Sequence, residues 1–316
     1  MERQPRSLQV LLIAGLVALA VFPFLGDKFY VEFITKIMIM ALFAMSLDLL
    51  VGYTGLVSLG HAMFFGLAAY ALMFVTPENQ AAGLLSSLAL SVGIAAIASL
   101  LIGLLVLRTS GVYFIMVTLA FGEMAYFYVH DSNYLGGSDG KYIYVRPVLE
   151  LFGWKPFDLE NYTHFYYVAL VLLVFVYATL RVLFASPFGR VIVGIKENEH
   201  RLRMLGFATL RYKLAAFVLA GMLAGLAGWL TAAHDGLVNP AMLSWHQSGQ
   251  LLMMVILGGM GTPAGPLLGT AALKLLELLF QGWTRHWQLL LGAFIVLSVL
   301  FVPRGLAHLF EGKRRD

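Results

Sequence analysis

Long apolar stretches without a charged side chain recur along the chain. No Asp, Glu, Lys or Arg occurs in residues 7–26, 49–77, 79–107, 161–180, 214–234, 236–273 or 286–303. A helix needs about 20 predominantly apolar residues to cross the hydrocarbon core of a bilayer. The pattern therefore predicts an all-α polytopic membrane protein.

We expect about ten transmembrane helices, near residues 8–26, 31–51, 60–76, 83–107, 112–130, 164–184, 212–233, 244–260, 264–281 and 287–302. Gly and Pro in the middle of residues 250–280 divide that stretch into two short helices. The ten helices form a single transmembrane domain, residues 1–316. Two connections are large: an external loop, residues 131–163, and a cytoplasmic segment, residues 185–211.

Composition and charge refine this topology. Apolar residues make up 60% of the chain and charged residues 12%, whereas soluble domains carry about 25% charged residues. With ten helices, 14 of the 21 Lys and Arg residues lie on one side of the membrane and five on the other. Cytoplasmic loops are enriched in Lys and Arg, so both termini and residues 185–211 are expected to be cytoplasmic. The chain has no cysteine, which excludes disulfides and thiolate metal sites.

The cytoplasmic segment has the pattern of a short amphipathic helix. Ser186 and Pro187 are typical of a helix start, and Gly206 is typical of a helix end. One face is apolar and the other carries opposite charges four residues apart. The apolar residues are Val191, Ile195, Leu202 and Leu205, and the charged pairs are Glu197–Arg201 and Glu199–Arg203. Two interpretations are open: the charges only fix the topology, or the helix docks a cytoplasmic partner.

Polar side chains inside the predicted helices are candidates for a functional site, because a charge in lipid is costly. Glu123 either faces a water-filled path or hydrogen-bonds a neighbouring helix. Asp48 is close to the cytoplasmic end of its helix and is expected at the membrane interface. Lys274 and Glu277, three residues apart, are expected to pair. His61 is either a packing residue or part of a pore.

Motifs for catalysis or nucleotide binding do not support an enzyme. The sequence has no G-x-x-x-x-G-K-[ST] phosphate loop. The GMGTPA of residues 259–264 fits a dinucleotide-binding pattern but lies between membrane helices without a βαβ unit. Ser138 in GGSDG lacks the strand–turn–helix context of a nucleophile, and no His is paired with a Glu at zinc-ligand spacing. We therefore expect no catalytic residue, cofactor, metal ion or nucleic acid on this chain.

Five stretches resemble one family of transporters. They are GYTGLVSLGHAMFFGLAAY (52–70), GVYFIMVTLAFGEM (111–124), GGSDG (136–140), IKENEHRLRMLGFATLRYKLAAFVLAGMLAGLAGWL (195–230) and GGMGTPAGPLLG (258–269). Together they resemble the permeases of ATP-binding-cassette (ABC) importers of the branched-chain amino acid family, and in particular the M-type membrane subunit. The resemblance runs from about Leu42 to Leu300. Residues 200–207, HRLRMLGF, depart from it, because the family usually has a run of small residues there.

The resemblance implies an ABC importer permease fold in the bacterial inner membrane. A second, H-type permease would share the translocation path, two ABC ATPases would bind and hydrolyse ATP with Mg²⁺, and an extracytoplasmic binding protein would deliver the substrate. The implied substrate is a branched-chain or other hydrophobic amino acid, although related permeases carry urea, short amides or aromatic acids. A different class of protein stays open: an ion-coupled secondary transporter that uses Glu123 or Asp48.

Candidate site residues follow from the motifs and from the resemblance. The expected ATPase-coupling segment comprises Lys196, Glu197, Asn198, Glu199, Arg201, Leu202, Leu205 and Gly206. The candidates for the translocation path are Ser58, His61 and Glu123. The candidates for docking the binding protein lie in the Gly-rich part of the external loop and are Gly136, Gly137, Asp139 and Gly140.

Overall fold

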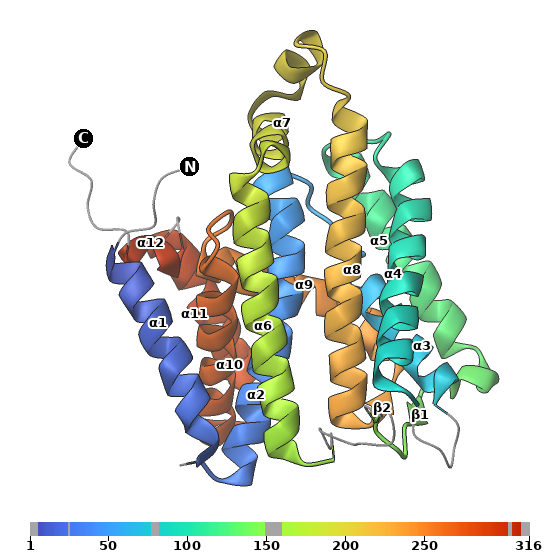
Figure 1. Cartoon of the computed structure of the whole chain (residues 1–316), viewed down its shortest axis with the longest axis vertical. Coiled ribbons are helices and arrows are strands. Elements are labelled where there is room, and N and C mark those ends of the chain that lie inside the picture. The colour runs from blue at the N-terminus through green and yellow to red at the C-terminus, as the bar shows by residue number, and fades with distance from the viewer. Residues whose placement is uncertain (1–5, 25, 77–81, 149–159, 303–304, 311–316) are drawn as a thin grey trace.

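The computed structural model describes residues 6–24, 26–76, 82–148, 160–302 and 305–310. It is a bundle of helices (Figure 1): α1 (Arg6–Val21), α2 (Lys28–Asp48), α3 (Ala62–Val75), α4 (Leu84–Val106), α5 (Val112–His130), α6 (Tyr162–Ala185), α7 (Pro187–Met204), α8 (Thr209–Asp235), α9 (Trp245–Gly258), α10 (Gly265–Trp283), α11 (Trp287–Phe301) and α12 (Leu306–Phe310). A helix lies in each of the ten ranges predicted from the sequence, and α7 and α12 lie outside those ranges.

Five segments are long and apolar enough to cross a membrane by themselves: Lys28–Thr54, Leu84–Val106, Val112–His130, Tyr162–Ala185 and Thr209–Asp235. The apolar helices α3 and α11 are shorter. Helix length and composition within the described residues therefore establish a multi-pass helical architecture.

The bundle has two distinct ends (Figure 1). α7 and the turn that joins it to α8 project from one end, toward which α12 and the start of α1 also lie. A small antiparallel sheet lies at the opposite end, where β1 (Lys141–Tyr142) pairs with β2 (Leu237–Val238). The segment predicted to be cytoplasmic and the described part of the loop predicted to be external thus lie at opposite ends of the molecule.

The centre of the bundle is packed through small residues of α8. A Cβ added at Gly221 would lie 2.5 Å from the Cβ of Ser99 on α4. A Cβ added at Gly228 would meet the backbone carbonyl of Phe65 on α3. Stripes of small residues let helix backbones approach closely in a membrane, so α8 is held tightly against both α3 and α4.

The connection between α2 and α3 is irregular. α2 continues into a π-helical turn, Leu49–Thr54, which ends at Gly55 with a φ of +76°. Glycine suits this position because other residues rarely adopt a positive φ. Residues 56–61 then continue outside any regular α-helix until α3 begins.

A second irregular connection lies between α8 and α9. Residues 236–244 pass through β2 and a short 3-10 helix, Pro240–Leu243, before α9 begins. The helices that follow the two irregular connections, α3 and α9, meet where the amide of Ala62 donates a hydrogen bond of 2.9 Å to Ser248 Oγ. Irregular backbone at membrane depth needs such partners within the protein, because lipid offers none.

Asp48 is buried rather than interfacial, which corrects the expectation from the sequence. Its residue surface is 3% exposed, and its Oδ1 accepts a hydrogen bond of 2.9 Å from the amide of Gly261. The π-helical turn extends the helix for six residues beyond Asp48, so this carboxylate is not at the helix end. Gly261 lies in the connection between α9 and α10, and the predicted division of residues 250–280 into two helices is confirmed.

Candidate functional site

The segment expected to couple to an ATPase forms α7, which is kinked. The helix begins as predicted: Pro187 follows Ser186, whose Oγ accepts a hydrogen bond of 3.4 Å from the amide of Gly189. Asn198 then has non-helical angles, φ −158° and ψ 91°. Its Oδ1 accepts a hydrogen bond of 2.9 Å from the amide of Arg201 and so caps the short helix that follows. The single amphipathic helix expected from the sequence is therefore two short helices joined at Asn198.

The kink separates the two predicted ion pairs. Asn198 lies between Glu197 and Arg201, so these residues are not one helical turn apart, and no ion pair joins them in the described structure. Glu199 and Arg203 do pair, with 2.6 Å between Glu199 Oε1 and Arg203 Nη2. The prediction was thus confirmed for the second pair and wrong for the first.

Glu199 joins α7 to the start of α8. Its Oε2 lies 2.8 Å from the ammonium of Lys213, and its Oε1 accepts a hydrogen bond of 3.0 Å from Thr209. Burial alone would raise the pKa of Glu199, but the hydrogen bonds from Lys213 and Arg203 outweigh burial and hold the pKa below its usual value. This cluster fixes the turn between the two helices.

Lys196 joins α7 to the π-helical turn that follows α2. Its Nζ donates a hydrogen bond of 2.6 Å to the carbonyl oxygen of Gly52 on the π-helical turn. The side chain of Lys196 runs over Gly55, where an added Cβ would lie 3.1 Å from Lys196 Cγ. Lys196, which the sequence assigns to the coupling segment, is therefore hydrogen-bonded to the π-helical turn that continues α2.

The predicted apolar stripe divides into a buried part and an exposed part. Ile195 is buried, and Leu202 packs against Gly194. Leu205 is 67% exposed, and Gly206 follows it with a φ of +86°, which confirms the predicted helix end. Leu205 belongs to an exposed apolar group at the turn between α7 and α8, named here the apolar tip: Met204, Leu205, Phe207 and Leu210.

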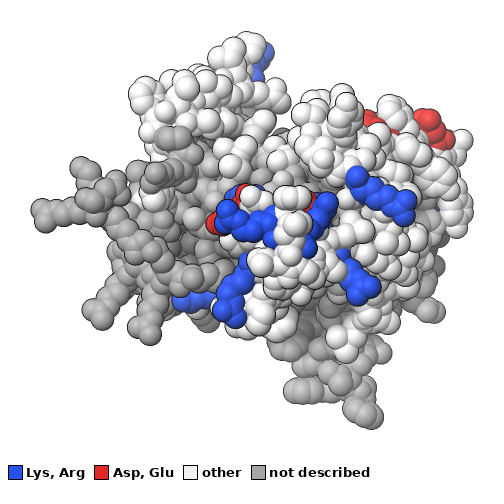
Figure 2. Space-filling model, turned by 90° about the horizontal axis from the view of Figure 1, so that it is seen from above, with Lys and Arg blue, Asp and Glu red and all other residues white. Residues whose placement is uncertain are grey.

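Basic side chains surround this end of the molecule. Figure 2 views it from above and shows Lys and Arg side chains gathered there with few acidic ones among them. Arg190, Arg201 and Arg211 are exposed residues of this region. The arrangement is an apolar tip with a basic surround, as protein interfaces often combine an apolar centre with a polar rim.

Two of the three candidates for the translocation path are packed in the interior. His61 is fully buried, with Nε2 2.8 Å from Ser46 Oγ and its ring stacked on Phe43. Ser58 is buried as well, and its hydroxyl has no hydrogen-bond partner among the described residues. Within this chain His61 thus packs against Ser46 and Phe43.

Glu123 hydrogen-bonds a neighbouring helix. Its Oε1, on α5, accepts a hydrogen bond of 3.3 Å from the amide of Trp245, the first residue of α9. The first amides of a helix have no partner within the helix, and a carboxylate is favourable there. Glu123 thus caps α9, while Ser248 of α9 caps α3.

The Gly-rich candidates of the external loop form a tight turn. Gly136, Gly137 and Gly140 all have positive φ. A Cβ at Gly140 would meet the carbonyl oxygen of Val238 on β2, so this glycine lets the loop lie against β2. Asp139 is exposed. Residues 149–159 of the predicted external loop lie outside the described residues.

Sequence reasoning missed several residues that organise this site. Gly52, Ser248 and Gly261 each bond a residue from a distant part of the chain, up to 213 positions away. Local spacing carries no signal for such contacts. The small residues of the quoted family stretches were the available hint, because Gly52 and Gly261 both lie in them.

Known proteins show one consistent similarity. Residues 29–300 match the family model described as "Branched-chain amino acid transport system / permease component". The high-affinity branched-chain amino acid transport system permease protein LivM of Salmonella typhimurium is 30% identical over 94% of this chain and 74% of its own length. LivH of Escherichia coli K12, a permease protein of the same kind of system, is 26% identical over 38% of this chain and 40% of its own. The autoinducer 2 import system permease protein LsrC of Photorhabdus laumondii is 27% identical over 47% of this chain and 44% of its own. No solved structure matches.

Proposed function

Because the chain belongs to the family of branched-chain amino acid transport permease components, we propose that it is the M-type membrane subunit of an ATP-driven importer of branched-chain or other hydrophobic amino acids. The observation that carries the proposal is the similarity to LivM over nearly the whole chain. The exposed apolar tip supports it, since a permease without nucleotide-binding motifs needs a surface on which an ATPase can act.

The proposed assembly has four kinds of subunit. This chain and an H-type permease form the path, two ABC ATPases bind ATP and Mg²⁺ and hydrolyse the ATP, and an extracytoplasmic binding protein delivers the amino acid. This chain itself is non-catalytic. The match to LivH supports a related second permease.

The proposed topology has ten crossings, with both termini and α7 in the cytoplasm of a bacterial cell and the chain in its inner membrane. The basic residues gathered around α7 support this orientation (Figure 2). The described part of the external loop then faces the binding protein, with Asp139 exposed.

In the proposed coupling step, an ATPase binds the apolar tip and displaces α7. The hydrogen bond from Lys196 to Gly52 passes this displacement to the π-helical turn. The bond from Asp48 to Gly261 passes it on to the connection between α9 and α10. ATP hydrolysis outside the membrane is thereby linked to the π-helical turn and to the connection between α9 and α10.

An ion-coupled secondary transporter is the less supported alternative. Its two candidate carboxylates, Glu123 and Asp48, both accept backbone hydrogen bonds, from Trp245 and Gly261 respectively. These contacts give both carboxylates a structural task, which favours the ATP-driven importer.

Reconstitution tests the proposal. The chain is purified with its partner subunits, placed in proteoliposomes, and assayed for uptake of labelled L-leucine with ATP on the ATPase side. We expect uptake that requires ATP and the binding protein, and no uptake by the lone chain under a pH or sodium gradient. Uptake of urea, acetamide or an aromatic acid in place of L-leucine would change the substrate assignment. Uptake by the lone chain under a pH or sodium gradient would overturn the proposal of an ATP-driven importer.

A further inference from the structure

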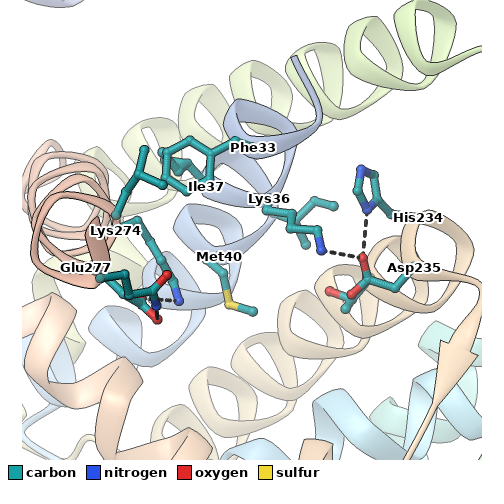
Figure 3. A pocket seen from close by; sticks show the side chains of 12 residues that line it. Phe33, Lys36, Ile37, Met40, His234, Asp235, Lys274 and Glu277 are labelled. Atoms are coloured by element: carbon teal, nitrogen blue, oxygen red, sulfur yellow. Dashed lines mark hydrogen bonds and ion pairs between the residues drawn. The ribbon is translucent and has the colours of Figure 1, made fainter. Parts of the chain in front are cut away.

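A cavity of about 160 Å³ lies between α2, α8 and α10, and two ion pairs face it (Figure 3). Lys36 Nζ lies 3.0 Å from Asp235 Oδ1, which joins α2 to α8. Lys274 Nζ lies 2.8 Å from Glu277 Oε2 on α10. The pairing of Lys274 with Glu277 was predicted from the sequence and is confirmed, whereas the partner of Lys36 was not predicted.

The cavity opens in the half of the bundle away from α7. Asp235 is the last residue of α8, at the end that carries the small β-sheet. Lys36 and Lys274 lie in the interior of their helices. A ligand that arrives from the side opposite to the coupling segment would therefore reach this cavity first.

The wall between the two ion pairs is apolar. Phe33, Ile37 and Met40 of α2 line it between the charged groups. An apolar cavity of about 150 Å³ is large enough for benzene, so this one has room for a ligand with a small aliphatic side chain. The cavity thus combines two positive groups, two negative groups and an apolar wall, with no net charge.

The charged groups keep unused hydrogen-bonding capacity. Lys36 and His234 both bond Oδ1 of Asp235, at 3.0 and 2.9 Å. Within the described residues Oδ2 of Asp235 therefore has no partner. Each lysine ammonium has three donors, and Lys36 and Lys274 each use one of them in the described contacts. A ligand can be bound without breaking either ion pair.

We propose that this cavity binds an α-amino acid as a zwitterion on its way through the permease. The carboxylate of the ligand would accept from Lys36, its ammonium would donate to Oδ2 of Asp235, and its aliphatic side chain would lie against the apolar wall that separates this pair from Lys274 and Glu277. This inference rests on the proposed function and deepens it, because it assigns amino-acid recognition to this chain as well as to the binding protein. A zwitterion matches the charges of the cavity, whereas an amine or an acid alone leaves one set unmatched.

Binding to the full chain in lipid nanodiscs, without the binding protein, provides the test. Saturation-transfer NMR with L-leucine as the probe is expected to show saturable binding. Competition by 3-methylbutylamine, which lacks the carboxylate, and by 4-methylpentanoate, which lacks the ammonium, is expected to be at least roughly tenfold weaker than by L-isoleucine, because hydrogen bonds to charged groups are the strong ones.

Matched variants locate the site. The double variant Lys36→Met/Asp235→Asn removes the ion pair that would bind the ligand without changing the net charge, and Met40→Trp fills the cavity while leaving every charge in place. Both are expected to weaken L-leucine binding at least roughly tenfold. The control is Lys28→Met/Glu32→Gln, which removes an exposed ion pair of 3.8 Å from the start of the same helix and is expected to leave binding unchanged.

The outcomes separate this inference from the proposed function. Two results would overturn the cavity as a binding site: both cavity variants bind L-leucine as tightly as the unchanged chain, or the unchanged chain shows no saturable binding. If the unchanged importer still takes up L-leucine, the proposed function stands. Failure of the wild-type importer to take up any amino acid would instead overturn the proposed function. Equal competition by the amine or the acid would show that the cavity does not recognise a zwitterion.

Discussion

The ammonium of Lys196 donates a hydrogen bond of 2.6 Å to the backbone carbonyl of Gly52. Gly52 lies four residues after Asp48, whose carboxylate holds the amide of Gly261. A single side chain on α7 is thus connected to the end of α2 and, through it, to the connection between α9 and α10. We expect the effects of changes at Lys196 to appear in coupling rather than in assembly.

Lys196→Met should uncouple the importer. The apolar tip is unchanged, so both ATPases should still co-purify, but uptake should fall roughly tenfold because a hydrogen bond from a charged donor is lost. Arg190→Met is the control, since it removes an exposed charge from the same helix. ATP hydrolysis and amino-acid uptake are measured in the same proteoliposomes, and wild-type uptake in Lys196→Met would remove this contact from the coupling path.

Leu205→Asp should prevent attachment of the ATPases. Leu205 is largely exposed, so the chain should still fold and insert, but a buried apolar anchor of the interface would become a desolvated charge. Co-purification of the ATPases is measured against membrane abundance. Glu197→Gln serves as the control and should change little, because rim charges mainly tune association rates. Retention of both ATPases by Leu205→Asp would mean that residues 185–211 only fix the topology.

Glu199 should stabilise the α7–α8 turn in a pH-dependent manner. Its pKa is lowered in the folded chain, so its contribution to the free energy of unfolding is present above its ordinary pKa of 4.5 and is lost as the pH falls through the lower, folded-state value. Glu199→Gln should therefore lower the Tm near neutral pH, and the difference from wild type should shrink in acid. Glu197→Gln, without an ion pair in the described structure, is the control. A pH-independent difference would contradict the ionic origin of this effect.

Ser248→Ala should destabilise the contact between α3 and α9. The amide of Ala62 would lose its acceptor, and loss of a helix cap costs about 0.5–2 kcal/mol. Thermal unfolding of the purified chain measures the change. Ser86→Ala is the control, because the Ser86 hydroxyl is exposed and donates to the carbonyl of Gly83 at the start of its own helix. Equal Tm values for the two variants would argue against the Ala62–Ser248 contact.

Charge reversal of Asp139 should weaken stimulation of the ATPases by the binding protein. Asp139 is exposed in the Gly-rich turn, and exposed charges are screened by salt, so the effect of Asp139→Lys should be larger at low than at high ionic strength. Lys28→Glu, at another exposed site, is a control for altered surface charge. Unchanged stimulation at low salt would remove this turn from the docking surface. Glu150 and Asp158, two further acids of the external loop, lie outside the described residues.

Local pattern was sufficient to predict the helices and their ends. The apolar stretches predicted where the helices lie, and Gly206 and the GGMGTPAGPLLG stretch marked helix ends because Gly and Pro act on the backbone at their own positions. Lys274 and Glu277 could be paired from their spacing alone. Each of these predictions depends on residues within a few positions of one another.

The misses share the opposite property. The π-helical turn after Asp48 is held by partners that are distant in sequence, Lys196 and Gly261. The kink at Asn198 depends on a side chain whose hydrogen bond to the backbone competes with the helix. Lys36 and Asp235 are 199 positions apart, and Ala62 and Ser248 are 186 apart. Their contacts follow from how the helices assemble, which the spacing of residues along one helix does not encode.

The glycine contacts of α8 have a mechanical consequence. Where a Cβ would collide with Ser99 or with the backbone of Phe65, helices cannot slide without separating. We expect α3, α4 and α8 to move as one rigid body during transport. α2 meets α8 partly through the long side chain of Lys36, which lines the cavity and can keep its pairing with Asp235 while the helices shift. The hinge of the transport cycle would then lie along the cavity, with the α3–α4–α8 unit as its fixed side.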